Sequence, residues 1–349
     1  MIHKWLEATE DNGASVRVLL FDYRKAFDLI DHKILVNKLK QVNLPNSVIN
    51  WFINFLSGRS QRVKLGKDCL SEWGTVTSGV PQATELGPWL LIINDLTVPS
   101  IFNMWKYVND TTVSESIPRG QQSKSQKTVD GIYDWSKENL LQLNGEKTKE
   151  LVISFSRDPP QLHRVCIDRT PIKNIQSTKL LDLTINDTLT WNEHIEELVK
   201  KASKKLYFRI QLKRTHVTTS DLVTYFCACF RSRLDYACPV FHYSLRKYIQ
   251  VELKSMQRRA LSCIFPRVHY SDAPQIAGLE TIRAHRGNLT EDLFKSIVND
   301  PHSNITSLVP PSVSLSYQLR RQRRFAMPPV KTNRFGNSFI VKSARKAFK

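Results

Sequence analysis

The fold is decided by residues 16–23, VRVLLFDY, a run of apolar and β-branched residues that ends at an aspartate. A short apolar run of this kind predicts a buried strand, with Asp22 at its end. A second segment, residues 101–114, alternates apolar and polar side chains and is interrupted at Asn109-Asp110. Because this pair favours tight turns, we expect a hairpin with both residues at its tip.

The segments around these two predict a layered α/β fold. The expected elements are helices at 26–42, 46–56, 89–96 and 129–140, and strands at 62–65, 72–77 and 151–156. Strands and helices that alternate in this way form a sheet covered by helices. We therefore assign residues 1–175 to one α/β (α+β) domain.

The chain changes character near residue 175. Three long helical patterns follow, at 191–214, 220–241 and 245–265, and they predict an all-helical domain over residues 176–300. Residues 301–349 are rich in Pro, Ser and Arg, and we expect them to form a loosely packed basic tail.

The positive charge lies entirely in the second half of the chain. Residues 1–200 hold 24 basic and 24 acidic side chains, whereas residues 201–349 hold 27 and 8, which supplies the whole net charge of +19. A solvated basic tail is one interpretation. A polyanion partner, with phosphate as the anion, is the other.

The composition argues against a secreted or membrane protein. The apolar runs are far shorter than the ~18 residues that a membrane helix needs, and the N-terminus lacks the pattern of a signal peptide. We expect an intracellular protein of the nucleus or cytoplasm, without a membrane partner.

The six cysteines lack the spacing of a zinc site, and we expect Cys227 and Cys229 to be core residues.

Two of the predicted turns carry carboxylates that suit metal chemistry. Nucleotide polymerisation uses two divalent metals about 3.5–4 Å apart, and Mg²⁺ prefers carboxylate oxygens. An aspartate at a strand end beside a hairpin tip provides such ligands, and Asp22 and Asp110 have these positions. Each residue alone has a simpler interpretation, as a helix cap or as a turn residue.

Further segments extend this pattern along nearly the whole chain. They are FDYRKAFD at 21–28, GVPQATELGP at 79–88, YVND at 107–110, LNGEKT at 143–148, KLLD at 179–182 and KTNRF at 331–335. In this order and at these spacings the first five resemble motifs A to E of the reverse transcriptases of non-LTR retrotransposons. The last segment is typical of the jockey-like group of these LINE-type elements.

The resemblance implies a fold and a reaction. The fold is a right-hand polymerase, with a palm and incomplete fingers over residues 1–175, a thumb-like domain over 176–300 and a basic tail over 301–349. The reaction is RNA-directed DNA polymerisation. Its partners are an RNA template, a DNA primer and deoxynucleotide triphosphates, and its cofactor is a pair of Mg²⁺ ions.

The resemblance also implies roles for individual residues. Asp22 and Asp110 match metal-binding aspartates, and Lys147 matches a lysine proposed to protonate pyrophosphate; a solvent-exposed lysine at a helix end is the alternative. The positions that match the nucleotide site are Lys25, Ala26, Phe27, Gln82 and Ala83. Within this set, Phe27 matches the steric gate that rejects a ribose 2′-hydroxyl.

Four positions depart from the family pattern. Asn109 replaces an aspartate that bridges both metals, and losing such a charge typically costs several kcal/mol of transition-state stabilisation. Ala83 and Asp182 replace glycines of motifs B and E. The connection 89–93 is two residues shorter than in the family, which rotates the following helix by about 200°. We therefore expect impaired catalysis, with Asn109 as one of several lesions, so that Asp at position 109 alone should not restore full activity.

The chain starts about twenty residues before Asp22. In the family most of the fingers subdomain lies before this aspartate. We therefore expect most of the fingers and the endonuclease to be missing, as in a decayed remnant of a retrotransposon reading frame.

Three hypotheses about function follow. The chain is a catalytically dead reverse transcriptase, a residually active one, or a non-catalytic nucleic-acid-binding protein that uses its basic half. The expected nucleic-acid-binding residues are Lys204, Lys205, Lys213, Arg214, Arg258, Arg259, Arg320, Arg321, Arg323 and Arg324. The arginines at 320–324 also match a nuclear localisation signal.

Overall fold

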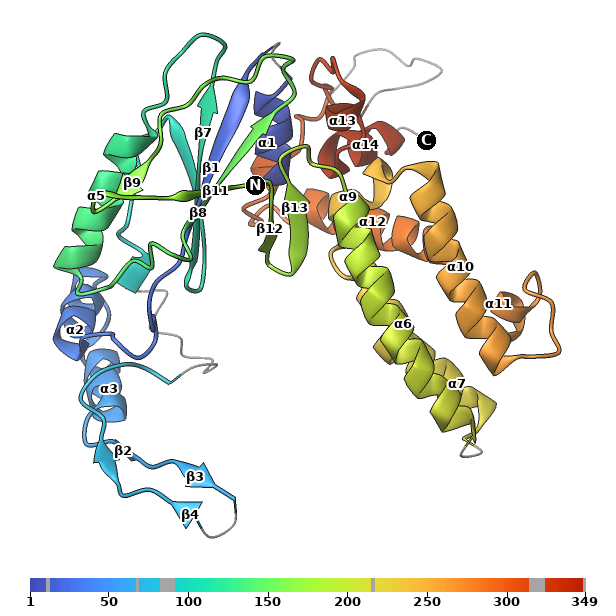
Figure 1. Ribbon diagram of the computed structural model, residues 1–349, viewed down its shortest axis with the longest axis horizontal. Coiled ribbons are helices and arrows are strands. Elements are labelled where there is room, and N and C mark those ends of the chain that lie inside the picture. The colour runs from blue at the N-terminus through green and yellow to red at the C-terminus, as the bar shows by residue number, and fades with distance from the viewer. Residues whose placement is uncertain (11–12, 67–68, 82–91, 215–216, 314–323, 348–349) are drawn as a thin grey trace. The chain divides into compact units, whose positions relative to one another are not determined.

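The computed structural model describes the chain except for residues 11–12, 67–68, 82–91, 215–216, 314–323 and 348–349 (Figure 1). The chain forms two compact units. The sheet unit is Asn12–Gln176, and the helical unit is Met1–Asp11 together with Ser177–Lys349. The predicted first domain, 1–175, thus differs from the sheet unit at its beginning, because the N-terminal residues pack with the C-terminal half.

The sheet unit is built on a mixed five-stranded sheet in the order β11-β8-β1-β7-β6. Neighbouring strands are antiparallel, except that β11 and β8 run parallel. The strands are β1 (Ser15–Phe21), β6 (Phe102–Tyr107), β7 (Asp110–Ile117), β8 (Lys149–Ser154) and β11 (Lys173–Ile175). The buried strand predicted at 16–23 is confirmed as the central strand of this sheet.

One face of this sheet packs against helix α5 (Ser125–Glu138). Leu19 of β1 and Val113 of β7 lie opposite each other, and both join Val129 and Ile132 of α5 in one buried cluster. Burying such a side chain typically contributes about 1.5–3 kcal/mol. A two-stranded ribbon, β9 (Cys166–Ile167) with β10 (Thr170–Pro171), also contacts α5.

Helix α2 (His32–Gln41) begins later than the sequence predicted. The expected helix started at residue 26, but Asp31 caps the observed one. Its carboxylate accepts hydrogen bonds from the backbone N–H groups of Lys33 and Ile34, at 2.8 and 2.9 Å. Such a cap satisfies orphan donors of the first turn and fixes where a helix starts. Residues 26–28 form a turn instead, and residue 29 is a bend.

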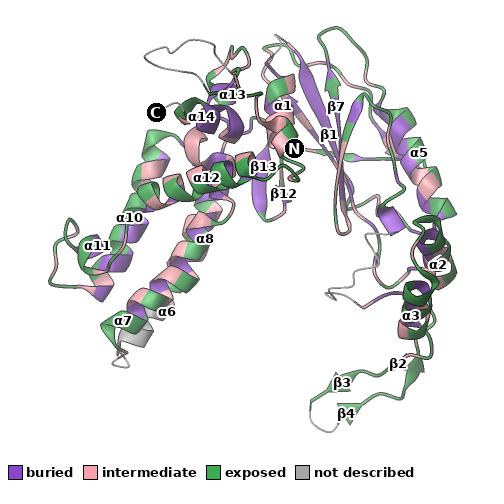
Figure 2. Cartoon of the chain, turned by 180° about the vertical axis from the view of Figure 1, so that it is seen from behind, coloured by how far each residue is buried: buried purple, intermediate pink, exposed green. Residues whose placement is uncertain are grey.

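Helix α3 (Asn46–Leu56) lies where the sequence predicted it and leads into an exposed arm. The strands of the arm are β2 (Ser60–Gln61), β3 (Lys64–Leu65), β4 (Cys69–Leu70) and β5 (Gly74–Thr75). β2 pairs with β5 and β3 with β4, each over two residues. These strands are shorter than the strands predicted at 62–65 and 72–77. Figure 2 shows β2 to β4 exposed along their length.

The longer segment of the helical unit, Ser177–Lys349, begins with a hairpin that the sequence did not predict. Its strands β12 (Ser177–Leu180) and β13 (Leu183–Asn186) pair through Leu180 and Leu183, so Leu181 and Asp182 form the turn. Both turn residues have positive φ angles, 50° and 61°. The prediction of an all-helical region over 176–300 was therefore wrong at its start, because the usual Asn-Gly turn signal is missing.

Helices make up most of the rest of this unit. They are α1 (Ile2–Ala8), α6 (Asn192–Arg214), α7 (Thr219–Tyr225), α8 (Ser232–Asp235), α9 (Cys238–Phe241), α10 (Lys247–Ile264), α11 (Ala273–Ile276), α12 (Ile282–Asn299), α13 (Asn333–Gly336) and α14 (Phe339–Lys346). None of the described helices is both long and apolar enough to cross a membrane.

The predicted helix at 220–241 is broken into pieces. A π-helical turn, Phe226–Arg231, separates α7 from α8, and Ala237, with φ of 49°, ends the run before α9. Cys227 and Cys229 lie on the π-helical turn and are half-buried, so the expectation that they are core residues was wrong. The fully buried cysteine is Cys238 at the start of α9.

The last residues of the chain are more ordered than a loose tail. In α14, Ile340, Val341 and Ala344 are buried, and Ala344 packs with Phe294 of α12. Spacing of one, three and four residues places these side chains on one face of the helix. The prediction of a loosely packed tail over 301–349 was therefore wrong for α13 and α14.

Candidate active site

Asp22 and Asp110 lie next to each other at one end of the sheet. β1 pairs with β7 so that Phe21 lies opposite Thr111. Asp22 directly follows β1, and Asp110 is the first residue of β7. Continuing the antiparallel register by one residue therefore sets Asp22 opposite Asp110. Directly opposed residues have Cβ atoms about 4.5–5.5 Å apart. The sheet thus brings together two carboxylates that are 88 positions apart in the sequence.

The hairpin between β6 and β7 presents Asp110 and Asn109. Tyr107 pairs with Asp110, so the two turn residues are Val108 and Asn109, one position earlier than predicted. Val108 has a φ of 52°, which is rare for a β-branched residue. Its side chain packs against the core around Tyr23, and this contact holds the strained turn in place.

The charges of this pair affect each other. Burial raises the pKa of the Asp110 carboxyl, and the negative charge of Asp22 raises it further. Oδ2 of Asp22 is buried and has no hydrogen-bond donor among the described residues. Two neighbouring carboxylates that repel each other are an environment in which a bound cation is stabilising.

Lys147 approaches the pair from a neighbouring turn. Its Nζ is 4.0 Å from Oδ2 of Asp22, and its side chain is 71% exposed. The backbone N–H of Asn144 donates to the carbonyl of Asp22 at 2.8 Å, and Thr148 N–H donates to the carbonyl of Asn144 at 2.8 Å. Lys147 is therefore in a turn fixed against the end of β1, not at a helix end.

The loop after Asp22 is held by the first residues of the predicted motif B. The carbonyl of Phe27 accepts a hydrogen bond from Val80 N–H, and that of Ile30 accepts one from Gly79 N–H, both at 2.8 Å. Gly79 has a φ of 84°, and a Cβ there would lie 2.7 Å from the carbonyl oxygen of Asp28. This position therefore requires glycine.

The expected nucleotide-binding residues of this loop differ in exposure. Lys25 is exposed with a φ of 45°, Ala26 is buried, and Phe27 is half-buried against the core that includes α2 and α3. Gln82 and Ala83 lie outside the described residues.

Sequence reasoning missed two lysines that hold the segment after motif B. Lys38 Nζ donates to the carbonyl of Ile92 and to Asp95, each at 2.7 Å. Lys106 Nζ donates to the carbonyls of Ile93 and Leu96, each at 2.6 Å. Burial lowers the pKa of Lys106, and Asp95 opposes this shift. The apolar helical pattern of 32–41 gave no signal that Lys38 is buried.

The residues available to hold a metal ion at this end of the sheet are the carboxylates of Asp22 and Asp110. Among the residues that the structure describes, no group of three or more His, Cys, Asp or Glu side chains is arranged to hold a metal ion. Mg²⁺ usually keeps several waters and binds one or two protein carboxylates. Asp22 and Asp110 are the two carboxylates that would hold Mg²⁺ here, and residue 109, where the resemblance implies an aspartate, is Asn and supplies no carboxylate.

Asp182 forms an ion pair. Its carboxylate is 3.1 Å from Lys201 Nζ on α6. Its φ of 61° explains why a glycine suits this position, since glycine adopts positive φ without strain.

The expected nucleic-acid-binding residues are partly described. Lys204 and Lys205 on α6 and Arg258 and Arg259 on α10 are exposed, and these two helices pack against each other. Lys213 and Arg214 lie in α6, where the structure does not describe their side chains. Arg320, Arg321 and Arg323 lie outside the described residues. Arg324 is exposed and lies over the ring of Phe325, 5.5 Å from its centroid.

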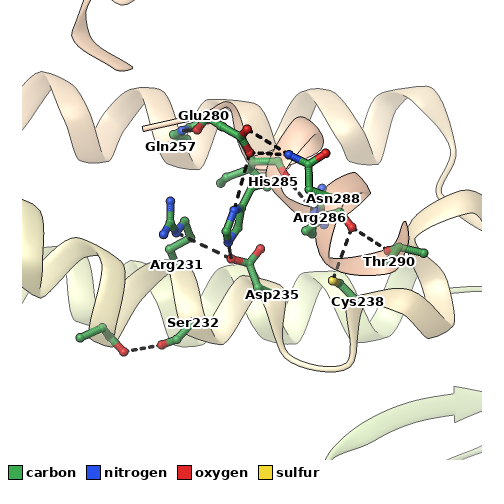
Figure 3. Close-up of polar contacts among 12 residues, drawn as sticks. Arg231, Ser232, Asp235, Cys238, Gln257, Glu280, His285, Arg286, Asn288 and Thr290 are labelled. Atoms are coloured by element: carbon green, nitrogen blue, oxygen red, sulfur yellow. Dashed lines mark hydrogen bonds and ion pairs between the residues drawn. The ribbon is translucent and has the colours of Figure 1, made fainter. Parts of the chain in front are cut away.

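The helical unit contains a polar network that the sequence did not predict (Figure 3). Asp235 of α8 lies 3.5 Å from His285 Nε2 and 3.9 Å from Arg231 Nε. Burial raises the pKa of Asp235 to about 6, while Arg286 and Arg231 oppose this shift. Arg286 itself is 1% exposed. Asp235 and Arg286 are 51 positions apart, and no sequence pattern joins them.

Comparisons with known proteins assign no family to the chain. No protein-family model matches it, and no curated protein matches it. One similar solved structure is telomerase from Candida albicans in complex with a TWJ fragment of telomeric RNA. That match has 10% sequence identity and a TM-score of 0.35, and covers 84% of this chain and 52% of the telomerase chain. The chain thus spans about half the length of that relative, and so distant a likeness does not assign an activity.

Proposed function

We propose that this chain is a reverse-transcriptase-derived protein of the non-LTR, jockey-like type, and that its RNA-directed DNA polymerase activity is impaired by Asn109. The observation that carries the proposal is the closeness of Asp22 and Asp110, which lie next to the paired residues Phe21 and Thr111 and interact electrostatically. The motif resemblance requires these two carboxylates to meet, although they are far apart in sequence. Lys147, 4.0 Å from Asp22, supports the same assignment.

In this proposal Asp22 and Asp110 hold one Mg²⁺ ion. The ion supplies Lewis acidity toward the phosphates of a deoxynucleotide triphosphate. Asn109 offers a neutral carbonyl oxygen in place of a carboxylate, so the site is one charge short of a two-metal centre. In this proposal Lys147, which is exposed beside Asp22, gives a proton to the departing pyrophosphate.

Primer extension on an RNA template tests this proposal. We expect Asn109→Asp to extend the primer on the order of 10²–10³ times faster than the unmodified chain, since single electrostatic groups typically contribute that much. Asp22→Asn serves as the inactive control. Equal extension by the unmodified chain and by Asn109→Asp would contradict the proposed role of Asn109.

Binding of nucleic acid without chemistry is the second candidate. The excess of basic residues after residue 200 favours it, together with the exposed cations of α6 and α10. The Asp22→Asn variant, which removes the catalytic carboxylate, tests this second candidate in a binding assay. If the basic half is the interface, that variant binds RNA as tightly as the unmodified chain, and its affinity falls steeply with salt.

A further inference from the structure

A cavity of about 500 Å³ lies between α10 and the beginning of α12 in the helical unit. Four basic side chains line it: Lys247 and Lys254 from α10, and Arg283 and Arg286 from α12. The remaining lining residues are neutral. A pocket with four cations and without a carboxylate in its lining has the composition of an anion site.

Arg286 is the residue that distinguishes this cavity from a basic surface. Its side chain is 1% exposed, and its Nη1 is buried without a hydrogen-bond acceptor among the described residues. Its Nε makes one long contact, 3.4 Å, to the carbonyl of Ile282. A buried guanidinium nitrogen without an acceptor is costly. An oxyanion that enters the cavity would offset this cost by supplying the missing hydrogen-bond acceptor.

The beginning of α12 is fixed around the cavity by neutral groups. Gln257 Oε1 accepts a hydrogen bond from Ile282 N–H at 3.0 Å, and Thr281 Oγ1 accepts one from Ala284 N–H at 3.2 Å. Thus no carboxylate caps this helix. The positive end of the helix dipole and the cations of the cavity act in the same direction.

Two acids near these cations, Glu280 and Asp235, are engaged with other groups. Glu280 accepts hydrogen bonds from Asn288 and lies 3.8 Å from His285 Nδ1. Asp235 faces Arg286 from α8, but it also lies close to Arg231 and His285, so one carboxylate is shared among several cations. A neighbouring cavity, which Arg283 and Arg286 also line, contains Glu291, and that carboxylate is 3.0 Å from Lys346. Positive charge therefore remains in excess at the cavity.

From these observations we infer that the cavity between α10 and α12 binds a phosphate group. Arg286 and Arg283 provide the guanidinium donors, and Lys247 and Lys254 add charge at its exposed side. The phosphate belongs either to a nucleic-acid backbone or to a free phosphate compound. This site is separate from the Asp22–Asp110 pair and does not depend on polymerase activity.

Titration of the full-length chain with inorganic phosphate at constant ionic strength tests the inference. No primer, template or Mg²⁺ is present, so the result is independent of the proposed polymerase. The test variant is Lys247→Ala/Arg283→Ala, which changes two exposed residues and leaves the buried Arg286 in place. Lys295→Ala, on the same helix and 69% exposed, is the matched control.

We expect the double variant to bind phosphate at least tenfold more weakly, while the control binds as the unmodified chain does. Circular dichroism of each variant checks that it is folded. Absence of phosphate binding, or equal binding by the double variant, would overturn the inference.

A 5′-mononucleotide and a single-stranded oligonucleotide without a terminal phosphate then identify which kind of molecule supplies the phosphate. Tighter binding of the oligonucleotide assigns the site to backbone phosphates, and tighter binding of the mononucleotide assigns it to a terminal phosphate.

Discussion

The residues of the candidate active site are held by contacts between segments that are far apart in the sequence. Asp22 follows β1 and Asp110 begins β7, and the antiparallel register of these two strands brings their carboxylates close together. Lys38 is buried because it donates to the carbonyl of Ile92, 54 residues away. The site therefore depends on the tertiary fold of the whole sheet unit.

At the residue scale, Gly79 offers a sharp test of how the loop after Asp22 is held. Gly79→Ala places a Cβ 2.7 Å from the carbonyl oxygen of Asp28, in addition to the strain of its positive φ. Gly120→Ala is the matched control, because it has a similar φ of 78° but open space around the new Cβ. We expect the control to lose about 1–2 kcal/mol and Gly79→Ala to lose clearly more. Urea unfolding measures both, and equal losses would show that the close approach is relieved without cost.

At the scale of elements, the β12–β13 hairpin shows why prediction from sequence failed in one place. Its turn residues, Leu181 and Asp182, both have positive φ, yet neither is Gly or Asn. The turn is stable because Leu180 and Leu183 are buried beside it and Asp182 pairs with Lys201. Contacts with α6 thus override the local preference of the turn, and these contacts are not visible in the sequence pattern.

The contact of this hairpin with α6 makes stability depend on pH. Nδ1 of His194 accepts a hydrogen bond from Thr184 N–H at 3.3 Å, and burial lowers the pKa of His194 from 6.5 to about 4. The folded state therefore requires the neutral ring. The unfolded state binds more protons between these two values, so stability is present above pH 6.5 and is lost as the pH falls toward 4.

Comparison of the unmodified chain with His194→Gln at pH 7.5 and pH 5 measures this effect. Between these two values the unmodified chain should lose roughly 2 kcal/mol more than the variant, because a lowered folded-state pKa translates directly into stability. His242, whose pKa burial also lowers to about 4, contributes equally to both proteins. The same loss in both proteins would rule out His194 as the cause.

At the scale of the molecule, the two compact units do not simply follow one another along the chain, because one of them is made of two separate segments. The beginning of the helical unit, Met1–Asp11, comes before the whole sheet unit. From composition and periodicity, the sequence predicted a domain boundary near residue 175, where strands and helices give way to long helices. It gave no sign that the first residues pack with the last, since residues more than 300 positions apart share no local pattern.

Glu10 makes the contact that joins the two ends of the chain. Its carboxylate accepts hydrogen bonds from the backbone N–H groups of Lys331 and Thr332, at 2.6 and 3.1 Å, and from the hydroxyl of Thr332. Thr332 in turn caps α13. Glu10 is only 9% exposed, so these hydrogen bonds are shielded from water.

Glu10→Gln should therefore loosen both ends of the helical unit together. The amide of Gln offers one acceptor oxygen and places an N–H₂ group against donors, which typically costs about 1–3 kcal/mol at a buried site. Hydrogen exchange of peptides covering residues 1–10 and 331–346 should become faster in parallel. The matched control is Glu7→Gln on α1, because Glu7 is exposed and pairs with Lys4 at the surface. Faster exchange at only one end would show that Glu10 does not couple them.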